Sequence, residues 1–292
     1  MKHIGVRGGV LLCFSAVLVA QEPVTPAPQP EILTNQGKPM VLPFRCTAED
    51  VHWAALSCTE DQPCPVFLEL SGVAVSPAGH LFVAGDIHTD SVTLYSTLLA
   101  SETAGQSWSE VHERIRGASL DQIQFLDAET GWVSGQELVP IPRDPFLLVT
   151  SDAGKTWASR PVLNDSAENR FGSVMQFFFT EKEQGLLIVD RGKGSGDERY
   201  ALFESRNGGE SWTIRQESGK PPRVKETPPT TDWRLRVDAA SHSFHIERRQ
   251  GARWNSVAAF AVKLDPCKIA PPPDPGVGNA RAAPNSDRGI AP

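Results

Sequence analysis

An eight-residue pattern occurs three times in the middle of the chain. The copies read SETAGQSW at residues 101–108, TSDAGKTW at 150–157 and SRNGGESW at 205–212. A weaker fourth copy, ERRQGARW at 247–254, keeps only the Gly-x-x-Trp frame. The copies begin at residues 101, 150, 205 and 247, and a spacing of 42 to 55 residues is typical of the blades of a β-propeller. The repeat therefore predicts an all-β chain built from similar units.

The sequence around each copy predicts strands. FLDAETGW at 125–132 and FTEKEQGL at 179–186 share one spacing of strand, turn and strand. Around the second copy we expect four strands near 120–125, 132–134, 146–149 and 157–162, which is one blade. The same outline fits 66–113 and 171–217, whereas 233–262 is one strand short, and residues 40–65 could supply the missing pairing. We expect a β-propeller-like fold of four to five blades of four antiparallel strands, with little helix.

These octapeptides resemble the Asp box, or BNR repeat, of the sialidase-type propellers. With FLDAETGWVSG at 125–135, the chain most resembles the propellers related to the photosystem II assembly and stability factor, over residues 66–254 and best over 118–157. Only Asp152 keeps the aspartate of the box, since Thr103 and Asn207 replace it. In that family the box is a structural hairpin between the third and fourth strands, because a short polar side chain bonds the turn, glycine permits a left-handed backbone and tryptophan packs between sheets. The resemblance therefore implies a structural role for Ser101, Gly105, Trp108, Asp152, Gly154, Trp157, Asn207, Gly209, Trp212, Gly251 and Trp254.

The ends of the chain differ in composition from its centre. Lys2 and Arg7 precede an apolar run that ends at Ala20, which predicts a signal peptide over 1–20 and a secreted or periplasmic protein. Residues 21–39 and 268–292 are rich in proline, and we expect them to be a disordered linker and tail around a domain of residues 40–267. The net charge of −7 disfavours a nucleic-acid or anionic-membrane partner. The sequence has no second long apolar run, so we expect no transmembrane segment in the mature chain.

Four cysteines remain after the signal peptide: Cys46, Cys58, Cys64 and Cys267. In an oxidising compartment they suit two disulfides, for which three pairings exist. Cys58 and Cys64 are close enough in sequence for a local loop, which leaves Cys46 to meet Cys267 and join the two ends of the domain. A zinc site is the alternative, but the spacing lacks the usual Cys-x-x-Cys pairs.

The sequence offers little that predicts catalysis. A sialidase would need an Arg-Ile-Pro motif, which is absent, and a tyrosine nucleophile, for which only Tyr95 and Tyr200 are available. Asp86, His88 and Asp90 could present metal ligands on one face of a strand, but this is an ordinary pattern at a blade turn. We therefore predict no catalytic residue, no cofactor and no metal site, although two carboxylates 5 to 10 Å apart in a central pocket would indicate a carbohydrate-active hydrolase.

The leading hypothesis is a non-enzymatic binding or assembly module, monomeric, whose partner is a protein or a glycan. A degenerate structural module of a larger envelope assembly is a further possibility. The long turns between second and third strands should carry the partner surface, on the face opposite the Asp boxes. The residues expected there are Asp86, His88, Arg143, Asp144, Asp190, Arg191, Asp197 and Arg199.

Overall fold

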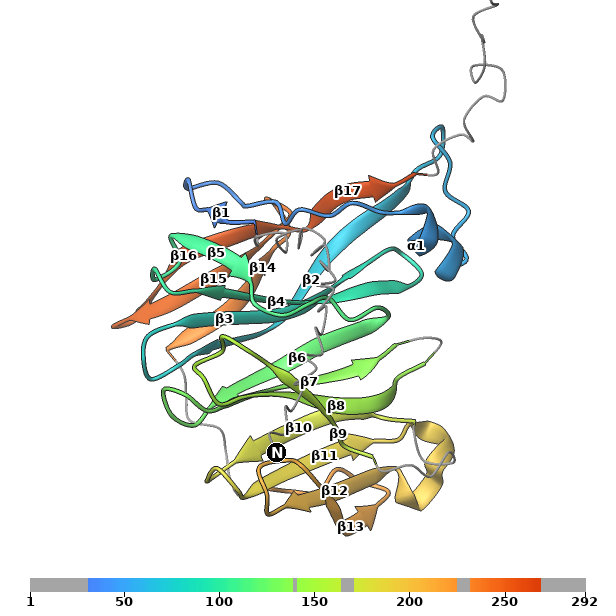
Figure 1. Ribbon diagram of the computed structural model, residues 1–292, viewed down its shortest axis with the longest axis vertical. Helices are drawn as coiled ribbons and strands as arrows, with labels where there is room; N and C mark the ends of the chain where they lie inside the picture. The colour runs from blue at the N-terminus through green and yellow to red at the C-terminus, as the bar shows by residue number, and fades with distance from the viewer. Residues whose placement is uncertain (1–30, 139–140, 164–170, 225–231, 269–292) are drawn as a thin grey trace, which may run out of the picture.

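Four antiparallel sheets make up the computed structural model, which describes residues 31–138, 141–163, 171–224 and 232–268 (Figure 1). Blade 1 consists of β2 (Cys64–Val75), β3 (Leu81–His88), β4 (Thr93–Ser101) and β5 (Ser107–Glu110). Blade 2 consists of β6 (Ala118–Phe125), β7 (Gly131–Glu137), β8 (Arg143–Thr150) and β9 (Ala158–Pro161). Blade 3 consists of β10 (Ser173–Phe179), β11 (Gly185–Asp190), β12 (Tyr200–Ser205) and β13 (Thr213–Ser218). Blade 4 has three strands, β14 (Trp233–Asp238), β15 (Ser243–Gln250) and β16 (Arg253–Ala261).

The propeller-like fold predicted from the repeat is confirmed. The four strands expected between residues 120 and 162 form β6 to β9, and the last unit is one strand short, as expected for 233–262. Helix is limited to α1 (Ala48–Trp53) and the 3₁₀ segment η1 (Lys193–Glu198) within the described residues. The described sheets number four, at the lower end of the expected range.

The blades pack in the order 4, 1, 2, 3. Apolar side chains fill each contact: Phe260 of blade 4 reaches the core of blade 1, Leu98 of blade 1 packs with Leu120 of blade 2, and Trp132 of blade 2 stacks on Phe179 of blade 3 with ring centroids 3.9 Å apart. Figure 1 shows blades 3 and 4 at opposite ends of this stack. The sheets therefore form an open arc rather than a closed ring.

The outward faces of the end blades explain why the arc stays open. On blade 4 that face carries an ion-pair network in which Glu247 accepts hydrogen bonds from Arg234 and Arg236, at 2.8 and 2.7 Å. Burying such charges against another sheet would cost several kcal/mol per ion unless every group kept a partner. On blade 3 the outward residues Ile188 and Leu202 are already buried, with Val224 packed against them.

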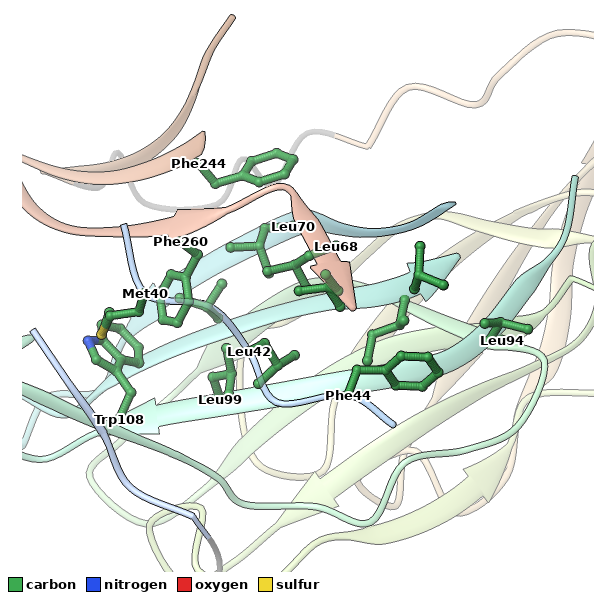
Figure 2. Packing of buried hydrophobic residues seen from close by; sticks show 14 of the residues in the cluster. Met40, Leu42, Phe44, Leu68, Leu70, Leu94, Leu99, Trp108, Phe244 and Phe260 are labelled. Carbon is green, nitrogen blue, oxygen red and sulfur yellow. The ribbon is translucent and has the colours of Figure 1, made fainter. Parts of the chain in front are cut away.

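A segment before β2, residues 40–44, lies between blade 1 and blade 4. Its Met40, Leu42 and Phe44 side chains are buried in the main core, where Met40 lies beside Trp108 and Phe260, Leu42 beside Leu99, and Phe44 toward Leu94 (Figure 2). Met40 forms a parallel bridge with Phe260, so the predicted pairing from residues 40–65 exists at this one residue. The rest of that stretch forms α1 and its loop, which the sequence analysis did not expect.

The ordered structure begins before residue 40. Leu33 and Thr34 form β1, which pairs with β5, and the Asn35 side chain donates a hydrogen bond to the carbonyl of Val257 over 2.8 Å. The expectation of a disordered linker is therefore wrong for residues 31–39, because backbone pairing with an exposed strand edge holds them. The predicted signal peptide, residues 21–30 and the tail from residue 269 lie outside the described residues.

Both predicted disulfides are present, Cys46–Cys267 and Cys58–Cys64. Cys267 ends β17 (Lys263–Cys267), which pairs with β2 and so belongs to the sheet of blade 1. The long-range bond fastens the N-terminal segment to this sheet. It does not join the first blade to the last one, because the chain has already returned to blade 1 when it reaches Cys267.

Candidate functional site

The three Asp-box hairpins use their polar groups internally. In each box the first hydroxyl accepts a hydrogen bond from a glycine N–H, with distances of 2.9, 3.0 and 2.9 Å at Gly105, Gly154 and Gly209. These glycines have φ between +83° and +88°, which favours a residue without Cβ. Asp152 accepts from the Thr156 N–H and hydroxyl, and these bonds lower the pKa of its carboxyl to about 2. Thr103 and Asn207 accept the equivalent backbone bond, at 2.8 and 3.0 Å, so the substitutions preserve the turn.

The turns predicted to carry the partner surface lie at the edge of the molecule opposite the Asp boxes (Figure 1). Their charged residues are largely paired with one another. Asp190 accepts two hydrogen bonds from Arg199, at 2.9 and 2.7 Å, and Arg191 lies 2.6 Å from Glu217. Arg143 and Asp144 form an ion pair of 2.6 Å, while Asp197 is exposed.

Five of the eight predicted partner residues lie in strands rather than in turns, since Arg143 and Asp144 begin β8 and Asp190 ends β11. Asp86 and His88 belong to β3 rather than to the turn after it, and Asp86 is buried with an exposed fraction of 7%. The His88 Nδ1 atom is 2.8 Å from the carbonyl oxygen of Thr89. Among the described residues, no three His, Cys, Asp or Glu side chains are placed to share a metal ion.

Tyr95 and Tyr200, the two tyrosines, are held by neighbours. The Tyr95 hydroxyl donates to the buried carboxylate of Asp50 at the start of α1. The Tyr200 ring lies under the guanidinium of Arg199, 4.8 Å from its centre. Both are packed aromatics, as the sequence analysis expected for Tyr95.

A hollow of about 340 Å³, here called the central groove, lies where the first strands of blades 1, 2 and 3 meet. Its walls are residues 71–75 of β2 and 121–125 of β6, with Phe177 of β10 at one side. Gly72 makes this geometry possible, since a Cβ there would lie 2.0 Å from the carbonyl oxygen of Asp121. A similar volume of about 360 Å³ lies between the Asp-box hairpins of blades 1 and 2, but there the box residues use their polar groups on each other.

Glutamine side chains hold blade 2 to the edge of blade 3. Gln122 donates to the Met175 carbonyl at 2.8 Å and accepts from the Phe177 N–H at 3.4 Å. Gln124 makes the same pair of bonds with the carbonyl and N–H of Phe179, both at 2.8 Å. An amide side chain offers both donors and an acceptor, so each glutamine replaces a missing neighbouring strand.

The edge of β2 in the central groove has no such cover among the described residues. β17 pairs with β2 only near residues 64–67, and the Leu68 N–H reaches the Val262 carbonyl at 2.7 Å. From Ser71 to Val75, no strand pairs with this edge of β2 anywhere in the described chain. An uncovered strand edge presents a row of N–H and C=O groups that can pair with another chain.

The carboxylates of Glu69 and Asp121 lie near enough to Asp86 to act on its pKa. Glu69 of β2 stands opposite Asp86 of β3 in the register, and Asp121 of β6 lines the central groove. Burial, together with the nearby charges of Glu69 and Asp121, raises the pKa of Asp86 to about 7, although His88 opposes this. Burial also raises the pKa of Asp121, against a hydrogen bond of 2.7 Å from Gln136.

Comparison with solved structures finds other propellers. The chain is similar in fold to YCF48. A structure of YCF48 bound to a D1 peptide is 17% identical with a TM-score of 0.40, and the match covers 66% of this chain and 56% of that one. YCF48 from Cyanidioschyzon merolae is 14% identical (TM-score 0.34, 64% of this chain and 55% of that one). An α-L-arabinanase from Penicillium chrysogenum complexed with arabinobiose is 13% identical (TM-score 0.34, 68% and 62%). The chain thus spans little more than half the length of the YCF48 structures, and no protein-family model and no curated protein matches its sequence.

The residues that build the central groove were not predicted from the sequence. The run DQIQF at 121–125 does carry a signal, because Gln122 and Gln124 alternate along a predicted strand and so point to one side of it. Nothing in the sequence places Asp121 beside Asp86, since that depends on how blades 1 and 2 pack, and the position of Glu69 opposite Asp86 depends on the register between β2 and β3. No helix in the described ranges has the length and apolar character needed to cross a membrane.

Proposed function

We propose that this propeller is a non-enzymatic binding module that holds an extended segment of a protein partner along the uncovered edge of β2 in the central groove. The observation that carries the proposal is the free strand edge from Ser71 to Val75, unpaired within the described chain, which forms one wall of a groove of about 340 Å³. Five residues of strand extend over about 17 Å and offer alternating donors and acceptors. A polypeptide in the extended conformation matches that spacing, and this is the physical basis of recognition by strand addition.

The side chains in the groove support a peptide rather than a glycan. Val73, Val75, Ile123 and Phe125 give the walls an apolar character, with polar groups at the Asp121 end. Alternate side chains of an extended peptide can contact such walls while its backbone pairs with β2. Among the described residues, the groove has neither tryptophan nor tyrosine to stack on a sugar ring.

The two disulfides support a site of action outside the reducing cytoplasm, as the predicted signal peptide does. In that compartment the module would act in assembly or retention of its partner. The paired charges on the long turns could contribute at the rim, and the residues predicted there remain candidates for that role.

Carbohydrate hydrolysis is the second candidate, and one observation favours it. Asp86 and Asp121 are neighbouring carboxyls with raised pKa values, as expected of a general acid beside a second carboxylate. Asp86 does not line the groove, however, and Asp121 is the only carboxylate among the described residues that does. Release of reducing sugar from arabinan or xyloglucan, abolished in Asp121→Asn, would establish the hydrolase and contradict our proposal.

A binding assay tests the proposed function. The mature protein would be screened against an immobilised library of ten-residue peptides, and affinities would be measured by fluorescence anisotropy. Ser71→Trp places a large side chain in the groove, and Thr180→Trp is the matched control on an exposed turn outside it. We expect Ser71→Trp to weaken peptide binding at least tenfold and Thr180→Trp to leave it unchanged. Equal binding by both variants, or no binding peptide at all, would overturn the proposal.

A further inference from the structure

Blade 4 has three strands within the described chain, and the register shows which one is missing. In blades 1 to 3 the Asp box connects the third strand to the fourth, and the equivalent segment of blade 4, residues 247–254, connects β15 to β16. Arg234 of β14 lies opposite Glu247, as Gly131 of blade 2 lies opposite Thr150, the first residue of its box. β14 therefore corresponds to a second strand, and blade 4 lacks its first strand.

The described ends of the chain do not supply this strand. β17, which follows β16, pairs with β2 and so belongs to blade 1. The N-terminal segment meets blade 4 at β16, where Met40 bridges Phe260, and this is the edge of the sheet opposite to β14. Throughout the ranges that the structure describes, no strand pairs with β14 on the side away from β15. We call this side the first-strand position of blade 4.

The backbone of β14 presents donors and acceptors to the first-strand position. Backbone groups alternate in direction along an antiparallel strand, and the Arg249 N–H donates to the Asp232 carbonyl at 2.7 Å. Every second residue from Asp232 onward therefore bonds β15, whereas Leu235 and Val237 direct their N–H and C=O groups to the first-strand position. Within the described structure no hydrogen bond reaches these groups of Leu235 or Val237. Such an edge can pair with another chain.

The side chain of Val237 is exposed because blade 4 is incomplete. Leu235 and Val237 lie on one side of β14, and Leu235 packs against the main core, yet 62% of Val237 is exposed. The residues at the same register in the complete blades are Ala84, Ser134 and Ile188. Their exposed fractions are 0%, 0% and 3%. A position that is buried in every complete blade is thus open to solvent in blade 4.

We propose that an extended segment of a partner protein occupies the first-strand position of blade 4 and runs antiparallel to β14. This inference goes beyond the proposed function, because it concerns a different strand edge from that of the central groove. The occupant would pair its backbone with Leu235 and Val237 and would cover the Val237 side chain, which is recognition by strand addition.

The complete blades indicate the chemistry of this occupant. Their first strands, β2, β6 and β10, run antiparallel to the second strands and direct apolar side chains such as Leu120 and Phe177 into the cores between blades. The partner segment should likewise carry apolar residues at alternate positions. A second copy of this chain has no spare strand among its described residues, since its first strands are already paired within blades 1 to 3. The segment therefore comes from a different protein.

Copies of the chain's own first strands are suitable probes. Labelled peptides LELSGVAV, residues 68–75, and ASLDQIQF, residues 118–125, would be titrated with the mature protein and followed by fluorescence anisotropy. Each would also be made with N-methyl groups on every second amide, in both frames. Strand pairing uses alternate N–H groups, so methylation in one frame should weaken binding at least tenfold and methylation in the other frame less than threefold.

Val237→Pro tests the edge itself. Proline removes the N–H that faces the first-strand position and no hydrogen bond to β15, so β14 should keep its place in the sheet. Val237→Thr is the matched control, because it keeps the N–H and the β-branched shape. We expect Val237→Pro to weaken peptide binding at least tenfold and Val237→Thr to weaken it less than threefold. Slower hydrogen exchange at the Leu235 and Val237 N–H groups of the wild type on peptide binding keeps the test valid if Val237→Pro does not fold.

The results that overturn the inference are distinct from those that overturn the proposed function. Unchanged binding by a folded Val237→Pro variant, equal effects of the two methylation frames, or no peptide binding at millimolar concentration would each overturn the inference. Protection from exchange confined to residues 71–75 would place the peptide in the central groove, which supports the proposed function and overturns the inference. Protection at Leu235 and Val237 alone would support the inference and leave the central groove without a peptide.

Discussion

Replacing Asp86 with asparagine should change how the stability of the fold depends on pH. In the folded protein, burial first and the neighbouring carboxylates second raise the pKa of Asp86 from 3.8 to about 7, whereas the unfolded chain keeps the ordinary value. Between these two pKa values the unfolded state has lost the proton that the folded state retains, so the free energy of unfolding falls as pH rises. The stabilisation is fully present below pH 3.8 and is lost as the pH passes about 7.

The size of the effect follows from the shift. About three pKa units at 1.36 kcal/mol each give roughly 4 kcal/mol lost between pH 4 and pH 8. The asparagine side chain carries no charge at any pH. The free energy of unfolding of the Asp86→Asn variant should therefore rise relative to that of the wild type by this amount between pH 4 and pH 8. Other carboxyls have lowered pKa values, such as Asp152 through hydrogen bonds from Thr156 and Asp190 through hydrogen bonds from Arg199. These groups make the free energy of unfolding rise with pH. Both proteins contain them, so their contribution cancels when the variant is compared with the wild type.

Urea denaturation of both proteins at each pH unit from 4 to 8 gives the measurement. Asp197→Asn, an exposed acid on the η1 segment, should follow the wild type throughout. A difference between Asp86→Asn and wild type that stays within about 1 kcal/mol from pH 4 to pH 8 would refute the reasoning, because it would mean that Asp86 titrates alike in the folded and unfolded states.

Five further substitutions test the packing and the long-range disulfide. Gly72→Ala should cost about 1–3 kcal/mol, since the new Cβ meets a β6 carbonyl at 2.0 Å, and an unchanged urea midpoint would contradict the close approach of the blades. Gln124→Leu should cost about 2 kcal/mol by leaving a β10 N–H and C=O without partners, an effect that hydrogen exchange would detect at that strand. Trp108→Ala should cost about 3–5 kcal/mol and Trp254→Ala much less, because Trp108 is fully buried whereas Trp254 lies under an arginine at the surface; equal melting temperatures for the two variants would be inconsistent with this. Cys267→Ser opens a loop whose ends are 221 residues apart and should cost about 5 kcal/mol in the chain-entropy model, so a loss below about 1 kcal/mol would argue against an entropic role.

The blades were predictable from the sequence because their signals are local. Each Asp box combines a glycine in a left-handed turn with a tryptophan that packs in the core, and this hairpin is fixed by eight consecutive residues. The pairing of Cys46 with Cys267 was also predictable, because the predicted signal peptide indicates an oxidising compartment and the four remaining cysteines allow only three pairings. Such features depend on neighbours in the sequence or on simple counting.

The central groove was not predictable, because it depends on how separate sheets pack. From the sequence alone, Gln124 would be interpreted as an exposed polar residue of a strand. Its role becomes visible only in the structure, where β10 lies beside it. Asp86 reads as part of a turn, yet β3 continues through it and buries it against blade 2. The open arc likewise depends on the charged outward face of blade 4, where Glu247 and its arginines come from different strands. Residue type alone does not show which sheet face will meet another sheet.

Hydrogen exchange of the β2 backbone in the presence of a bound peptide tests the central claim most directly. The N–H groups between Ser71 and Val75 that face the central groove have no strand partner in the described chain, so they should exchange rapidly in the free protein. A library peptide that binds should slow exchange at these residues, and Ser71→Trp should abolish the protection. Protection confined to the long turn at 190–199, with residues 71–75 unchanged, would contradict the account and assign binding to the turns at the edge of the blades.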